Sequence, residues 1–174
     1  MGCDIHSIAE VRGAGKWTAV TAEVFPFSEW DREYYKKDGG SAPFDWRSYS
    51  MFAFLAGVRN LDHCEPLAEP RGIPDDASEE AKEIEAFWGG NGHSHSYLTL
   101  KELLDFDYDK TFWNRRVTKQ VGPNAWSGGE LAEEGEGKIV TYRENLGPHF
   151  FAHLEALKAL GDPQDVRVVF LFDN

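Results

Sequence analysis

The chain has little cysteine, a shortage of positive charge and no long hydrophobic run. Its 174 residues include two cysteines, Cys3 and Cys64, too few for a disulfide framework or a zinc ribbon, so a reducing cytoplasm is the expected compartment. No apolar run approaches the roughly 18 residues of a membrane span, so no membrane partner is expected. Thirty acidic residues against 18 basic ones give a formal net charge of −12, which argues against broad binding to DNA.

Three common functional motifs are also missing. The sequence contains no Walker A loop, no Gly-x-Ser-x-Gly nucleophile elbow and no Rossmann glycine fingerprint. Candidate chemistry therefore has to come from other side chains, above all from the six histidines.

Aromatic side chains are abundant, at 14% of the residues, with six Trp and twelve Phe. Such rings either fill a hydrophobic core or supply flat faces on which bases stack. The length fits one domain, 1–174, large enough to bury a core.

Hydrophobic periodicity predicts strands near both ends of the chain and helices between them, which is typical of an α+β fold with a mixed or mostly antiparallel sheet. Strands are expected over 3–12, 16–25, 111–120, 138–143 and 165–172, and helices over 46–58, 78–87, 100–106 and 148–160. The segments 31–43, 59–76 and 121–137 are expected to be loops.

Local signals refine these boundaries. Gly13-Ala14-Gly15 predicts a hairpin turn. Asp76 with Glu79, and Thr99 with Glu102, have the spacing of capping boxes at helix starts.

The segment WGGNGHSHSYLTL at 88–100 places two histidines one residue apart after a run of glycines. In a regular strand, His93, His95 and Tyr97 would point to one side, and Ser94 and Ser96 to the other. The helix that is expected to follow would present free N–H groups that favour anions. This segment is therefore the first candidate site.

A second short motif, Asp4-Ile5-His6, also places two ligand-capable groups on one side of a strand. If the two motifs are neighbours, Asp4, His6, His93 and His95 could bind one divalent transition metal such as Zn²⁺ or Mn²⁺. Alternatively, imidazoles could act without metal as general base and acid, because histidine ordinarily titrates near neutral pH. The sequence leaves the metal, and hence any cofactor, undecided.

Arginine side chains match phosphate oxygens bidentately and are candidate phosphate clamps. The candidates for ligand binding are Arg59, Asn60, Arg71, Arg115 and Arg116, the rings of Trp46, Tyr49 and Tyr97, and the hydroxyls of Ser94 and Ser96. His149 and His153 are spaced i, i+4, but they lack the Glu of a zinc-binding helix and are expected to flank an amphipathic face.

The chain resembles a group of small phage-encoded proteins in several segments. These are MGCDIH at 1–6, FAFLAGVRN at 52–60, RGIP at 71–74, HSHS at 93–96, LTL at 98–100 and FDN at 172–174. Phage proteins of this size include inhibitors of host nucleotide signalling. Some are phosphodiesterases that cleave the cyclic oligonucleotides of anti-phage systems (the anti-CBASS phosphodiesterases), and others are sponges that sequester cyclic ADP-ribose-type signals. The resemblance implies an anti-defence role in the cytoplasm of a bacterial host.

The resulting prediction is a phosphodiesterase that cleaves a cyclic nucleotide signal with paired histidines, for which the catalytic candidates are His6, His93 and His95 together with Asp4. Its partner would be a small anionic nucleotide. The sequence does not decide whether the chain forms a homo-oligomer. A sponge that binds such a signal without turnover is the alternative, since it needs a pocket and stacking faces but no histidine pair. An acidic mimic of DNA ranks third, because the charges are mixed with many aromatic rings.

Overall fold

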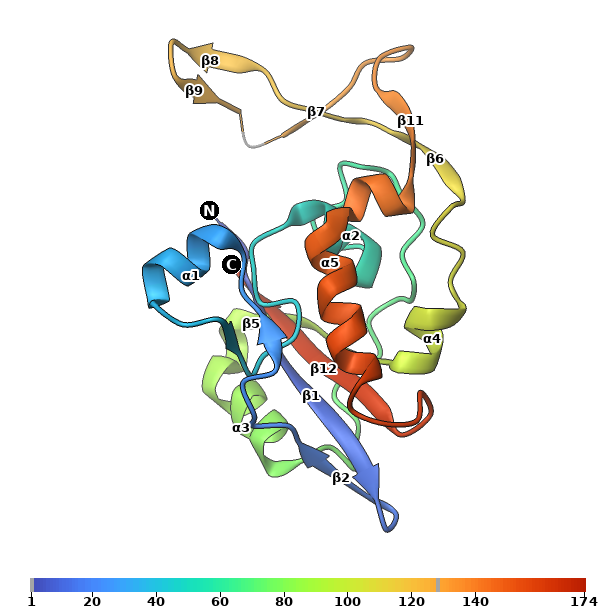
Figure 1. The fold of residues 1–174 in the computed structure, drawn as a ribbon. Coiled ribbons are helices and arrows are strands. Elements are labelled where there is room, and N and C mark those ends of the chain that lie inside the picture. The colour runs from blue at the N-terminus through green and yellow to red at the C-terminus, as the bar shows by residue number, and fades with distance from the viewer. Residues whose placement is uncertain (1, 128) are drawn as a thin grey trace.

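The computed structural model describes residues 2–127 and 129–174. A four-stranded antiparallel sheet of strand order β2-β1-β12-β5 forms its centre (Figure 1). The strands are β1 (Ile5–Gly13), β2 (Lys16–Ala19), β12 (Val166–Asp173) and β5 (Gly92–Thr99). The α+β prediction is confirmed, and the two ends of the chain pair at the middle of the sheet.

The β1–β12 pair runs from Ile5 opposite Phe172 to Val11 opposite Val166. The predicted hairpin after β1 is also present, because Ala14 and Gly15 both have the positive φ that a tight two-residue turn requires. The second strand is shorter than expected and ends at Ala19.

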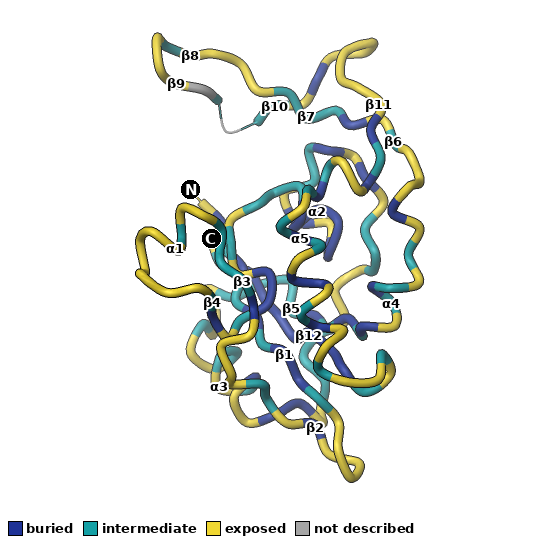
Figure 2. The backbone as a smooth tube through the Cα atoms, viewed as in Figure 1, coloured by how far each residue is buried: buried dark blue, intermediate teal, exposed yellow. Residues whose placement is uncertain are grey.

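One face of the sheet packs on the main hydrophobic core, which is formed with α2 (Tyr49–Ala56), α4 (Leu100–Asp105) and α5 (Tyr142–Lys158). Helix α2 is buried at every residue from Met51 to Ala56 (Figure 2). This confirms the prediction of a helix that is apolar nearly all round.

Helix α5 begins six residues before Pro148, earlier than the sequence predicts. Thr141 is its N-cap and forms a capping box with Glu144. Gly147, at φ 75° and ψ 169°, is not helical, so α5 consists of two helical segments joined at this residue. The second segment begins at Pro148, as the proline pattern predicts, and only the short segment before Gly147 was not predicted.

The other face of the sheet is covered by α3 (Glu79–Trp88), which continues into the short 3-10 helix η1 (Gly89–Asn91). Only Ala77, Ala81 and Val169 are fully buried in its apolar cluster. The N-cap of α3 is Ser78, which accepts a hydrogen bond from the Ala81 N–H, so the prediction of Asp76 was wrong. Asp76 instead pairs with Arg167 of β12.

The segment predicted as the loop 31–43 contains regular structure. Ser28 caps α1 (Glu29–Tyr35), and a short β-bridge joins β3 (Phe25–Pro26) to β4 (Gly39–Gly40). The acidic and aromatic residues of α1 therefore lie on a short helix.

Residues 111–127 and 129–141 belong to an arm that projects away from the sheet (Figure 1). It consists of three short antiparallel pairs. The pairs are β6 (Thr111–Asn114) with β11 (Lys138–Thr141), β7 (Arg116–Val117) with β10 (Glu130–Leu131), and β8 (Gln120–Gly122) with β9 (Ala125–Trp126). The predicted loop over 121–137 thus includes short strands. Among the helices of the described residues, none is long and apolar enough to cross a membrane.

Candidate functional site

The two histidine motifs lie at the same end of the sheet, with β12 between them. Ile5 of β1 and His93 of β5 are both register partners of Phe172. Neighbouring strands are about 4.8 Å apart, so the predicted proximity is real but one strand separates the motifs.

A β-bulge at Ser94 overturns the predicted alternation of the histidine segment. Ser94 has a φ of 51°, and the register shifts between Phe170, opposite Ser96, and Phe172, opposite His93. His93 therefore shares the core face with Ser96 and stacks on Phe172, with 6.1 Å between ring centroids. Tyr97 packs on the α3 face instead, so His93 and Tyr97 point to opposite faces.

His6 is the histidine that lies in a cleft. Its Nε2 is 3.1 Å from Oδ2 of Asp173 on β12, and its ring stacks on Trp88 with 4.1 Å between centroids. The other carboxylate oxygen of Asp173 accepts the backbone N–H of Asp4 at 2.8 Å. The positions of both side chains are thus fixed, because the backbone N–H of Asp4 holds Asp173, and Asp173 and Trp88 together hold His6.

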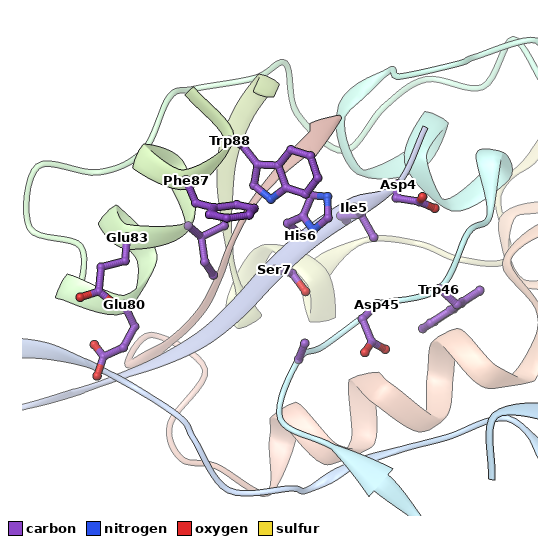
Figure 3. Close-up of a pocket in the computed structure, with 12 residues that line it drawn as sticks. Asp4, Ile5, His6, Ser7, Asp45, Trp46, Glu80, Glu83, Phe87 and Trp88 are labelled. Carbon is purple, nitrogen blue, oxygen red and sulfur yellow. The ribbon is translucent and has the colours of Figure 1, made fainter. Parts of the chain in front are cut away.

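The cleft beside His6 has a volume of about 780 Å³. Figure 3 shows α3 as one wall and the segment with Asp45 and Trp46 as the other, with His6 and Ser7 of β1 between them. The lining combines three aromatic rings with four carboxylates: Trp46, Phe87 and Trp88, and Asp4, Asp45, Glu80 and Glu83. Phe87 is 82% exposed and meets Trp88 edge-on, so its ring is not part of a core.

The pKa values of two of these carboxyl groups, Asp4 and Asp45, are shifted in opposite directions. Arg47 donates two hydrogen bonds to Asp4, at 2.8 and 2.6 Å, and thereby lowers the pKa of Asp4. Partial desolvation raises the pKa of Asp45, although the residue remains exposed to solvent. The cleft thus disfavours the ionised form of Asp45 and favours the ionised form of Asp4, each relative to an ordinary aspartate.

The predicted four-residue metal site is not formed. Within residues 2–127 and 129–174, no three or more His, Cys, Asp or Glu side chains are grouped so as to hold a metal ion. Asp4 is bound to Arg47 and His6 to Asp173.

Of the predicted catalytic histidines, His6 lines the cleft, whereas His93 and His95 are not among its lining residues. The Nε2 atoms of His93 and His95 are buried and have no hydrogen-bond partner among the described residues. His93 Nδ1 lies 3.0 Å from Ser94 Oγ.

The arginines predicted as phosphate clamps do not line the His6 cleft and contact other protein groups instead. Arg71 pairs bidentately with Glu102, Arg116 pairs with Asp62, and Arg115 donates to the carbonyl of Ala132. Arg59 donates to the side-chain oxygen of Asn174 at 3.1 Å.

Other predicted ligand-binding residues have structural contacts as well. Asn60 bonds the backbone of Cys64, Ser96 Oγ accepts the Arg71 N–H, and Tyr49 packs on Phe52. Tyr97 belongs to the cluster under α3. Trp46 is the one member of the predicted ligand-binding set that lines the His6 cleft.

Asp173 and Trp88 were missed as site residues. The sequence alone does not show that Asp173 lies beside His6. That follows only from the antiparallel pairing of β1 with β12. Trp88 belongs to the histidine segment, and its stacking on His6 depends on how α3 packs against β1.

No protein-family model, no curated protein and no solved structure matches the chain. Its role therefore has to be argued from the chemistry of the cleft.

Proposed function

We propose that the protein is a phosphodiesterase that acts on a small nucleotide signal bound in the cleft beside His6. The observation that carries this proposal is the His6–Asp173 pair, which lies in a cleft lined by aromatic rings. A carboxylate that accepts from one imidazole nitrogen fixes the tautomer and leaves the other nitrogen as a proton acceptor. In this proposal His6 alone acts as the general base, and the acid is a carboxyl group instead of a second histidine.

In this mechanism Nδ1 of His6 accepts the proton of a ribose 2′-hydroxyl, whose oxygen attacks the adjacent phosphorus. The bond from phosphorus to the 5′ oxygen breaks, and Asp45 is the candidate acid that protonates this leaving oxygen. The product is a 2′,3′-cyclic phosphate with a free 5′-hydroxyl. Asp173 stabilises the imidazolium that forms on His6.

The carboxylates of the cleft constrain how such a ligand would lie. Phosphate next to Glu80 and Glu83 would be repelled, whereas the amino groups of a base donate well to carboxylates. The base would therefore lie against Trp88 and Phe87 near the glutamates. The phosphate would lie toward Asp4, whose charge is paired with Arg47.

The test is product analysis with a panel of 3′,5′-cyclic mononucleotides and cyclic dinucleotides. Purified protein is expected to convert at least one of them to a 2′,3′-cyclic phosphate, and the His6→Ala variant is expected to lose this conversion. Release of only intact nucleotides, after incubation and heating, would contradict catalysis.

A sponge that sequesters a nucleotide is the second candidate. The observation that favours it is the ring area presented by Trp46, Phe87 and Trp88, because stacking supports affinity without any chemistry. In that case heating would release the bound nucleotide unchanged, and His6→Ala would weaken binding rather than turnover. In either form the proposed setting is the cytoplasm of an infected bacterial host, as the resemblance to phage proteins implies.

A further inference from the structure

A second cavity adjoins the His6 cleft. Its volume is about 620 Å³, and it shares Asp4, Asp45 and Trp46 with the first cavity. The remaining lining comes from α1, from the segment before it, and from Arg47, and it consists of Phe27, Trp30, Asp31, Tyr35 and Arg47. The two cavities therefore lie on either side of one shared wall.

The rings of α1 are exposed to an unusual degree. Trp30, Tyr34 and Tyr35 are 68%, 66% and 54% exposed, and α1 has no buried residue. Trp30 stacks flat on Tyr34 with 5.3 Å between centroids, and Tyr35 meets Phe27 at the same separation. These side chains do not fill a core, and grouped exposed rings are typical of a binding surface.

Arg47 connects the two cavities electrostatically. It lines the second cavity, while its Nε and Nη2 donate to Asp4 of the shared wall. A guanidinium has five N–H donors, and Asp4 is the acceptor of two of them among the described residues, so Arg47 can also donate to a phosphate at the wall.

We propose that the second cavity is a second ring subsite for the same ligand, which is therefore a dinucleotide with one base in each cavity. This inference rests on the proposed function, because it assumes a nucleotide at His6. One base stacks on Trp88, the other stacks on Trp30 and Tyr35, and one of the two phosphates that link the nucleosides lies beside Arg47 at the shared wall. A mononucleotide would fill only the cleft at His6.

The test measures affinity for two hydrolysis-resistant probes, the phosphorothioate analogues of a cyclic dinucleotide (di-adenosine or di-guanosine) and of the matching 3′,5′-cyclic mononucleotide. Trp30→Ala and Tyr35→Ala are each expected to weaken dinucleotide binding about tenfold and to leave mononucleotide binding within twofold, since stacking on one ring is lost. Trp88→Ala is expected to weaken both probes. Trp113→Ala is the control, because Trp113 is an exposed tryptophan of the arm.

The outcomes separate this inference from the proposed function. If Trp30→Ala and Tyr35→Ala bind the dinucleotide as the parent does while Trp88→Ala does not, the second subsite is wrong and the cleft at His6 stands. Equal affinity of the parent for both probes also overturns the second subsite. If the parent binds neither probe, the inference and the proposed function both fail. Circular dichroism checks each variant, and since α1 buries no side chain, its variants are expected to fold.

Discussion

The two faces of the central sheet differ in how they are covered. The face under α2 and α5 carries a continuous core, with Phe52, Phe150 and Phe172 at zero exposure. The face under α3 has a smaller apolar set, in which Ala77, Ala81 and Val169 form one cluster and Leu171 and Trp17 are also buried, and it holds a buried ion pair between Glu10 and Arg167. The first face accounts for stability, whereas the thinly covered second face leaves space for a cleft at His6.

The same comparison explains which polar groups are available for chemistry. On the core face, both ring nitrogens of His153 already have hydrogen-bond partners in the protein. Its Nδ1 accepts the Phe44 N–H, and its Nε2 lies 2.8 Å from the Pro26 carbonyl oxygen. On the α3 face, His6 has one nitrogen held by Asp173 and its side chain is 27% exposed. A histidine at the edge of a cleft can exchange protons with a ligand, while a buried one cannot.

The largest expected effect is the loss of a core ring. Phe52→Ala removes a fully buried phenyl that packs edge-on against Phe172 and is expected to lower the free energy of unfolding by about 4 kcal/mol. Ile84→Ala on the other face is the matched variant, with an expected loss of about 1 kcal/mol because Ile84 borders the open cleft. Urea unfolding measures both, and equal losses would contradict the difference between the faces.

The ion pair under α3 is expected to matter nearly as much. Glu10 accepts from the Arg167 Nε and from the Ser78 N–H that begins α3. Glu10→Ala would leave the Arg167 charge buried without this partner, at a cost of about 3 kcal/mol. Glu80→Ala, in a side chain of the cleft, serves as the control and should leave the urea midpoint nearly unchanged. A mild effect of Glu10→Ala would show that α3 is held mainly by its apolar contacts.

The buried histidine of the core face predicts an acid-sensitive stability. Desolvation lowers the pKa of His153 to about 4, below the ordinary value near ~6.5. Between these values the unfolded chain binds a proton that the folded chain excludes, so stability falls as the pH drops from about 6.5 to 4, by about 3 kcal/mol in all. Above pH ~6.5 His153 contributes no pH dependence.

Denaturation curves at several pH values test this expectation. His153→Gln should flatten the acid-side slope, whereas His63→Gln, in an exposed loop, should leave it as in the parent. A slope that persists unchanged in His153→Gln would assign the acid sensitivity to other groups.

The smallest expected effect concerns Arg71, which the sequence singled out as a phosphate clamp. Its half-exposed ion pair with Glu102 lies away from the His6 cleft, so Arg71→Ala is expected to change stability by about 1 kcal/mol or less. Nucleotide affinity should stay as in the parent. A tenfold weaker affinity, measured by calorimetry, would restore the clamp and move the ligand away from His6.

The sequence was most informative where local chemistry decides the structure. The buried helix α2, the Thr99–Glu102 capping box and the strand β12 were all predicted from neighbouring residues. The bulge at Ser94 was not, because a left-handed backbone at a serine depends on its tertiary setting. The candidate site follows the same division: Asp4 and His6 are singled out by their local motif, whereas their partners Arg47 and Asp173 come from distant segments of the chain.

The most direct test of the account is the Asp173→Asn variant, assayed for nucleotide turnover beside the parent. An asparagine oxygen can still accept the Asp4 N–H, but its amide group cannot accept from His6, so the imidazole loses its tautomer control. If the His6–Asp173 pair is the catalytic base, Asp173→Asn keeps a normal melting temperature and lowers the turnover rate by about 100-fold or more. Turnover at the parental rate in Asp173→Asn would contradict the assignment of the His6–Asp173 pair as the catalytic base.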